Sequence, residues 1–286
     1  MKQEDIRARL QSLANQTSKR KDLWKPKDNH LIRLLPYPHG DEPFIELGFH
    51  YELGKTRAVL CPNYNDGEEC PICDFAAKLK SWNDEDGNEK PKSTREADWE
   101  IFKKIQVKSR YYVAMVERDV NDDEKNPDSE PKFWAFGKMI FERLLTLCLN
   151  DEMNEAAHSR GTGVFVDPEG AYDLRIDFKQ ANNKDGKGND KRFPVTTVEL
   201  GKLAPLKLAK TKKKVEEILA KIPNMEEVYP KTSTKEVNKI FMDFVNSGEL
   251  PEDDSGSGTE YKANSAEKPV EGTQSIDAAF GKLAGE

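Results

Sequence analysis

The chain has 286 residues, of which 36% are hydrophobic and 34% are charged. This low share of hydrophobic residues means that part of the chain must lie outside any core. No apolar run approaches the ~18 residues that cross a bilayer, and the first residues lack the apolar region of a signal peptide. We therefore expect no membrane association and a reducing compartment, in which cysteines bind metal more readily than they form disulfides.

The net charge of −7 is unevenly distributed along the chain. Residues 1–30 carry eight basic and four acidic side chains, and residues 179–214 carry eleven basic and three acidic ones. Residues 248–286 carry nine acidic side chains and three lysines. This segregation predicts a polyanion-binding body with an acidic tail, although ordinary solvated charge would also fit each block.

The first predicted elements belong to a basic arm and to a strand-rich segment. Residues 1–25 form the arm, which could contact phosphates or a neighbouring copy, and a mobile terminus fits its composition equally well. A core over residues 26–248 follows, and an acidic tail over 249–286 ends the chain; both termini are expected to be disordered. The core is predicted to begin with strands at 30–35, 44–50 and 56–60 and a helix at 75–82.

Metal-ligating residue types are concentrated between residues 50 and 73. They follow the pattern His-x10-Cys-x8-Cys-x2-Cys, and the candidate ligands are His50, Cys61, Cys70 and Cys73. The Cys-x2-Cys turn can bind one metal with two thiolates, and a hairpin would bring the other two ligands to the same point. One imidazole and three thiolates form a closed tetrahedral set for one structural Zn2+. A disulfide or redox pair is the alternative, and His39 is the rival fourth ligand.

The remaining elements are predicted from periodicity and turn residues. A polar loop over 83–98 comes first, and the last helix has the clearest start, where Ser233 and Glu236 form a capping box. Cys148 is expected to be a core thiol. The predicted helices are 99–105, 138–149, 212–222 and 234–246, and the predicted strands are 110–116, 132–136, 163–166, 172–178 and 193–200.

These elements predict an α+β, β-rich fold with an OB-fold core and an inserted zinc-binding subdomain around residues 43–82. Aromatic and cationic residues lie together in Lys108-Ser-Arg-Tyr-Tyr112. Strand geometry sends Tyr111 and Tyr112 to opposite faces, so only one of them can be an exposed platform. Exposed aromatic rings stack on unpaired bases while cations contact phosphates; the alternative is that these rings fill the core.

The order of features resembles the zinc-containing single-stranded DNA-binding proteins of T-even-type bacteriophages, which destabilise DNA helices. The resemblance rests on Leu31-Ile-Arg-Leu-Leu-Pro36, the four candidate metal ligands, Lys108–Tyr112, Phe136-Gly-Lys138 and the acidic tail. It covers residues 24–250 in order. Both longer ligand spacings are shorter here than in the family pattern, and the basic cluster of the arm lies farther from Met1.

The resemblance implies a cooperative, sequence-nonspecific single-stranded DNA-binding protein in phage DNA replication, recombination and repair, located in the cytoplasm of the infected bacterial host. It implies a zinc subdomain beside the DNA cleft and an arm that contacts the adjacent copy through Lys19, Arg20 and Lys21. The acidic tail would bind phage replication and recombination proteins and compete with DNA. The DNA-binding residues that follow are Arg33, Tyr64, Trp82, Phe102, Lys108, Arg110, Tyr111, Tyr112, Trp134, Lys138, Lys191, Arg192 and Phe193.

Two other classes of function stay open at this point. A zinc-containing replication or transcription adaptor would work through its acidic tail, and a metal-dependent nuclease would use paired carboxylates. The sequence has no Gly-rich phosphate loop and no nucleophile elbow. We therefore expect a protein that is not an enzyme.

Overall fold

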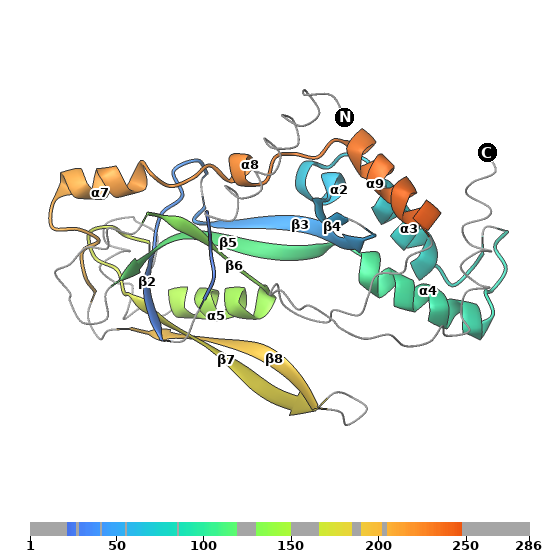
Figure 1. Ribbon diagram of the computed structural model, residues 1–286, viewed down its shortest axis with the longest axis horizontal. Helices are drawn as coiled ribbons and strands as arrows, with labels where there is room; N and C mark the ends of the chain where they lie inside the picture. The colour runs from blue at the N-terminus through green and yellow to red at the C-terminus, as the bar shows by residue number, and fades with distance from the viewer. Residues whose placement is uncertain are drawn as a thin grey trace, which may run out of the picture. The chain divides into compact units, whose positions relative to one another are not determined.

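The computed structural model describes residues 22–26, 29–40, 42–54, 56–84, 86–118, 130–149, 166–184, 190–201 and 205–247, with the backbone alone for 179–184 and 190–194. The chain divides into two compact units, and Figure 1 labels the helices and strands that form them. The first, which we call the sheet unit, comprises Met1–Glu46 and Arg110–Pro230. The second, which we call the cysteine unit, comprises Leu47–Ser109 and Lys231–Glu286. Most of the predicted strand 163–166, the basic cluster of the arm and the tail lie outside the described residues.

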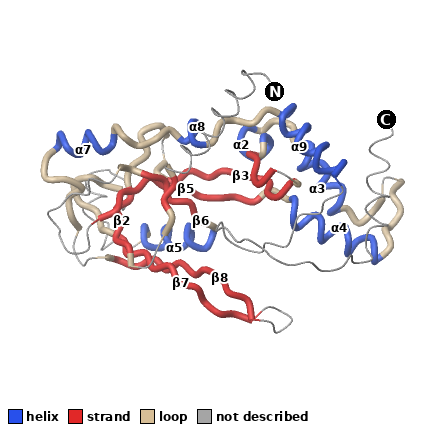
Figure 2. Tube along the Cα trace, viewed as in Figure 1, coloured by secondary structure: helices blue, strands red, loops and turns tan. Residues whose placement is uncertain are grey.

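The sheet unit is built on strands in the order β1-β6-β5-β2-β7-β8. β5 pairs antiparallel with β2 on one side and with β6 on the other, and β1 pairs parallel with β6. β7 and β8 form a long antiparallel ribbon (Figure 2). The bounds are β1 Leu23–Trp24, β2 His30–Leu34, β5 Lys108–Arg118, β6 Lys132–Phe136, β7 Leu174–Lys184 and β8 Asp190–Leu200. The first residues of β5, before Arg110, belong to the cysteine unit.

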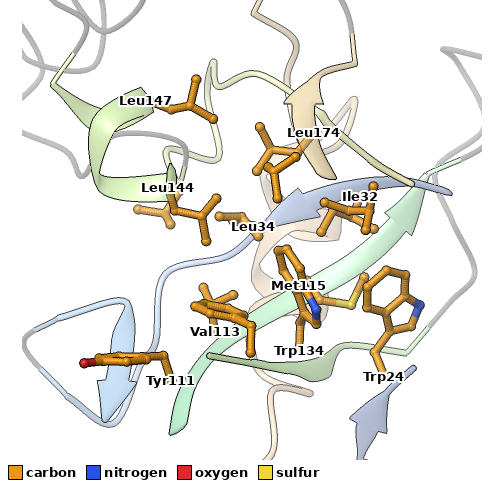
Figure 3. Packing of buried hydrophobic residues seen from close by; sticks show 14 residues of the cluster. Trp24, Ile32, Leu34, Tyr111, Val113, Met115, Trp134, Leu144, Leu147 and Leu174 are labelled. Carbon is orange, nitrogen blue, oxygen red and sulfur yellow. The ribbon is translucent and has the colours of Figure 1, made fainter. Parts of the chain in front are cut away.

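The core of the sheet unit lies between these strands and helix α5 (Lys138–Cys148). Figure 3 shows Leu144 of α5 pointing toward Leu34 of β2, while Tyr111 lies at the margin of the cluster. Strand positions that alternate along β2, β5 and β6 supply most of the remaining side chains, because alternate residues share one face. Two helices, α7 (Lys212–Leu219) and α8 (Met225–Val228), follow β8.

The described residues of the cysteine unit form one hairpin and four helices. β3 (Phe44–Leu53), whose first residues belong to the sheet unit, pairs antiparallel with β4 (Thr56–Leu60). Figure 2 shows α3 beside α4 and α9, and these helices bury apolar side chains against one another. The bounds are α2 Pro62–Asp66, α3 Pro71–Lys80, α4 Lys92–Ile105 and α9 Thr234–Ser247.

The predicted α+β, sheet-rich class is confirmed, because the described residues of each unit contain both paired strands and helices. The capping box of α9 is also confirmed: the Glu236 amide donates to the Ser233 hydroxyl, and the Glu236 carboxylate accepts from the Ser233 amide. The expected polar loop over 83–98 was wrong in its second half, because α4 already begins at Lys92. Among the described helices, none combines the length and apolar character that a bilayer crossing requires.

Candidate functional site

The four predicted metal ligands converge in the cysteine unit. The β3–β4 hairpin pairs His50 with Val59 and leads directly into Cys61. Cys70 precedes α3, and Cys73 lies in its first turn. One ligand atom from each of the four residues lies within 4.8 Å of every other. The hairpin and the helix start therefore bring together the set that the sequence predicted.

The distances within the cluster fit one tetrahedral ion. The Cys61 and Cys73 sulfurs are 3.4 Å apart, and Nε2 of His50 lies 3.4 Å from the Cys70 sulfur and 3.6 Å from the Cys73 sulfur. A tetrahedral ion at ~2.3 Å from each thiolate would separate two sulfurs by about 3.8 Å. His50, Cys61 and Cys70 are fully buried, so the site would be closed, as structural sites are.

Contacts within the cluster shift the pKa values of the Cys61 and Cys73 thiols in opposite directions. Hydrogen bonds from Cys70 and Cys73 lower the pKa of the Cys61 thiol to about 3. The hydrogen bond to Cys61 and the contact with Cys70 raise the pKa of Cys73 well above its ordinary value. Three thiolates at this spacing repel each other unless a cation compensates their charge. The donor set therefore suits a divalent metal ion better than it suits three free thiols.

The other histidine and cysteine that the sequence singled out lie elsewhere. His39 is exposed in the sheet unit and packs edge-on against Tyr37. Cys148 packs against the core of the sheet unit, and burial raises the pKa of its thiol to about 11. The four clustered ligand atoms include one from His50 and none from His39, and this favours His50 as the fourth ligand.

Tyr64 follows directly from the first cysteine ligand. It lies in α2, whose start is capped by the Cys61 sulfur accepting from the Tyr64 amide at 3.4 Å. Asn65 fixes this turn to β3, since its side chain accepts from the Gly48 amide and donates to the Gly48 carbonyl oxygen. The Tyr64 ring lies over Gly48 and is 44% exposed. A base could therefore stack on this ring.

Three further predicted DNA-binding residues lie in the cysteine unit. The Trp82 side chain is 71% exposed, and the Arg95 guanidinium lies 5.0 Å from its ring centroid. Phe102 is half-buried on α4, with the Lys80 ammonium 5.8 Å from its ring centroid. Lys108 is exposed at the start of β5. Trp82 and Lys108 are thus exposed to solvent, and Phe102 is partly exposed.

Arg110 and Lys138 both lie near the start of α5 in the sheet unit. Gly137 precedes this helix, and a side chain there would approach the Arg110 guanidinium at 3.5 Å. Lys138 is the first helical residue, is largely exposed and pairs with Glu142 at 3.6 Å. A helix start carries a partial positive charge and amide donors, so two cations beside it favour a phosphate.

The aromatic residues of β5 and β6 are buried within the sheet unit. Tyr111 stacks on Phe141 with ring centroids 4.0 Å apart. Tyr112 is 2% exposed on the opposite face, where it contacts Tyr229. The expected alternation is present, but neither tyrosine is the exposed platform that we anticipated, because both faces of β5 are covered. Trp134 is 1% exposed and packs edge-on against Trp24.

Arg33 is buried as well, at 1% exposure. Its guanidinium donates to Asp173 at 2.7 Å and to the Leu206 carbonyl oxygen at 2.8 Å. Arg118 reaches the second oxygen of the same carboxylate at 3.3 Å. Arg33 is thus held within the fold in this structure, and contact of Arg33, Tyr111, Tyr112 or Trp134 with DNA stays a prediction.

The side chains of Lys191, Arg192 and Phe193 lie outside the described residues, although their backbone forms part of β8. The arm residues Lys19, Arg20 and Lys21 lie wholly outside the described residues. Sequence reasoning overlooked Trp99, which is 47% exposed and stacks on Phe102. Its spacing from Arg95 and Phe102 on a helix could have revealed it, had the start of α4 been recognised.

Comparison with known proteins bears on this arrangement. The family model described as gp32 DNA binding protein like matches residues 27–244, which is more than half of the chain. Curated proteins give no match. The matched range includes the four metal ligands and every predicted DNA-binding residue, and the resemblance drawn from the sequence is confirmed at the level of the family. The chain therefore belongs to the gp32-like family of DNA-binding proteins.

Proposed function

We propose that this protein binds single-stranded DNA cooperatively and without sequence preference, and that it acts by binding rather than by catalysis. The membership of residues 27–244 in a DNA-binding family carries this proposal. Exposed aromatic rings support it, because bases offer a free face for stacking only when they are unpaired. Tyr64 and Trp82 are such rings in the cysteine unit.

Phosphate contacts would supply the sequence-independent part of the affinity. Lys108 in the cysteine unit, and Arg110 and Lys138 in the sheet unit, are the described cations that we assign to this role. Each phosphate neutralised releases counterions, so the affinity should fall steeply as the salt concentration rises. We assign the same role to Lys191 and Arg192, with Phe193 as a stacking residue, from the resemblance alone.

We further propose that the metal bound by His50, Cys61, Cys70 and Cys73 is one structural Zn2+. The chemistry of the donor set supports this identity, since three thiolates and one imidazole are typical of closed zinc sites. The ion would stabilise the start of α3 and the start of α2, the helix that carries Tyr64. Its contribution to DNA binding would therefore be to hold this segment in place.

The remaining parts of the proposal rest on sequence character. The basic arm, with Lys19, Arg20 and Lys21, would contact the next copy along the strand, and the acidic tail would bind phage replication and recombination proteins. Such a protein would coat single strands during phage replication, recombination and repair in the cytoplasm of the bacterial host.

Deletion of residues 1–21 should reduce cooperativity on long strands while leaving the affinity for a short oligonucleotide unchanged.

A titration of the full chain with oligo-dT and with a duplex of equal length tests the proposal. We expect tight binding to oligo-dT at low salt, weaker binding to the duplex and a linear fall of log affinity with log salt. Equal affinity for both would contradict the proposal, and so would absence of binding to either. Strand scission in the presence of Mg2+ would instead support a nuclease.

A further inference from the structure

We propose that Trp99 and Arg95 of α4 belong to a base-stacking surface that lies wholly within the cysteine unit. The surface comprises Lys80, Trp82, Arg95, Trp99 and Phe102, and we call it the aromatic strip. Its ligand would be the unpaired bases of single-stranded DNA, so the inference rests on the proposed function and extends it. Neither the family match nor the sequence resemblance assigns a role to Trp99, Arg95 or Lys80.

The helix geometry of α4 forms one half of the strip. Arg95, Trp99 and Phe102 follow one another at spacings of four and three residues, so they share one face of the helix. The buried residues Ile101 and Ile105 lie on another face, which packs against the core of the unit. The Trp99 and Phe102 rings stack with centroids 5.1 Å apart and an interplanar angle of 27°. Phe102 thus holds the Trp99 ring against the helix while leaving 47% of that residue exposed.

The loop between α3 and α4 brings Trp82 to the same face. The Lys90 amide donates to the Trp82 carbonyl oxygen at 2.9 Å, closing a short hairpin. Lys90 then ties this hairpin to both helices, since its ammonium donates to the Lys78 carbonyl oxygen and to the Asp98 carboxylate. The Arg95 guanidinium lies over the Trp82 ring and donates to Glu89 at 2.8 Å. Trp82 and Trp99 therefore flank Arg95, whose planar guanidinium is itself a stacking surface.

The charge of the surrounding residues indicates whether the aromatic strip would contact the bases or the phosphates of DNA. Residues 83–100 carry seven acidic and three basic side chains, which disfavours phosphate contacts on this segment. The acidic groups nearest the strip are paired: Glu89 with Arg95, Glu96 with Lys92, Asp98 with Lys90 and Glu100 with Lys103. Stacking depends on the exposed ring faces and little on net charge. We therefore assign base stacking, and not phosphate binding, to the strip.

The tryptophans of the chain make the strip directly observable. Of the four, Trp24 and Trp134 are buried in the core of the sheet unit, whereas Trp82 and Trp99 are exposed. A base that stacks on indole quenches its fluorescence and shields it from iodide. Addition of oligo-dT to the unmodified chain should therefore quench emission and reduce the iodide-accessible fraction. A Trp82→Phe/Trp99→Phe variant should bind oligo-dT with little change in emission.

Substitution at Trp99 tests the assignment by affinity. With a dT oligonucleotide short enough to bind one protomer, Trp99→Ala should lower the affinity by roughly 5- to 150-fold. Trp99→Phe should retain most of the affinity. Ser93→Ala, which changes an exposed residue on the same helix, should have no effect on it. An abasic oligonucleotide of equal length should bind the unmodified chain and Trp99→Ala equally. The slope of log affinity against log salt should be the same for both.

Several results would overturn the inference. Tight oligo-dT binding with unchanged tryptophan emission would refute the strip and leave the proposed function intact, whereas no binding to oligo-dT would refute both. An equal loss on dT and abasic strands would show that Trp99→Ala acts through the fold. A loss confined to long strands would mean that the strip contacts a neighbouring protein instead of DNA.

Discussion

Nδ1 of His50 lies 2.7 Å from the backbone carbonyl oxygen of Ile105, the last residue of α4. This hydrogen bond fixes the tautomer of the imidazole, because Nδ1 must carry the proton and Nε2 then faces the thiols. Both groups belong to the cysteine unit. This hydrogen bond links the four metal ligands to the helix that carries Trp99 and Phe102. Loss of the metal should therefore disturb the position of the aromatic strip.

Loss of one ligand should remove the metal and destabilise the protein. We expect Cys61→Ser or a strong chelator to abolish the stoichiometric metal, to lower Tm by more than about 10 °C and to weaken cooperative binding to oligo-dT. Elemental analysis and calorimetry measure the first two effects. Cys148→Ser is the matched control, since that thiol lies in the sheet unit and should leave the metal content unchanged. Full stability of the metal-free chain would contradict a structural role.

Substitution of Arg33 should mainly affect stability. Arg33→Met would leave the buried Asp173 carboxylate, among the ion pairs of the described residues, with the longer contact to Arg118. Removal of one partner from a buried ion pair costs about 3–5 kcal/mol, which urea unfolding would measure. The double variant with Asp173→Asn should recover part of this loss. If Arg33→Met instead left the free energy of unfolding unchanged and lowered only the oligo-dT affinity, the arginine would contact DNA and not Asp173.

Local sequence signals predicted some of these elements well. The helix at 234–246 and the strand at 132–136 agree with α9 and β6 to within one residue, since a capping box and a Gly or Pro marked their ends. The start of α4 was missed because Lys92 to Ala97 has no apolar periodicity, and β1 was missed because two residues become a strand only by pairing with β6. Local sequence carries no information on such distant partners.

The residues of the candidate site also fall into those that the sequence could predict and those that it could not. Metal ligands could be predicted because their residue types and spacing are specific to one geometry. The exposure of an aromatic or cationic residue depends on what covers it. Tyr112 is covered by a residue more than a hundred positions away, and Arg33 is paired with Asp173, which lies immediately before β7. Their burial therefore could not be predicted from the local pattern.

A phosphate contact at the start of α5 would depend on Lys138. We expect Lys138→Ala to reduce the slope of log affinity against log salt by about one unit and to leave Tm unchanged, because this side chain is exposed. Glu142→Gln is the matched control: it removes the paired carboxylate, so the affinity for oligo-dT should rise or stay constant. A slope equal to that of the unmodified chain would exclude Lys138 from the phosphate contacts.

The capping box of α9 should make the stability of this helix depend on pH. Hydrogen bonds from the Ser233 amide and hydroxyl lower the pKa of Glu236. A carboxylate whose pKa is lowered on folding stabilises the fold above its unfolded value of ~4.3, and this contribution is lost as the pH falls through the folded value. The difference in Tm between Glu236→Gln and the unmodified chain should therefore be present at pH 7 and should shrink at pH ~3.5. An equal difference at both values would show that ionisation is irrelevant.

Gly48 should control the orientation of Tyr64. A Cβ atom at Gly48 would lie 2.5 Å from two atoms of the Tyr64 ring, so Gly48→Ala must displace that side chain. We expect Gly48→Ala to lower the affinity for oligo-dT about as much as Tyr64→Ala does, with the metal content unchanged. The two substitutions together should cost no more than either alone, because both remove the same stacking surface. Additive losses would instead mean that Gly48→Ala acts through β3, and retained affinity in both single variants would remove Tyr64 from the DNA contacts.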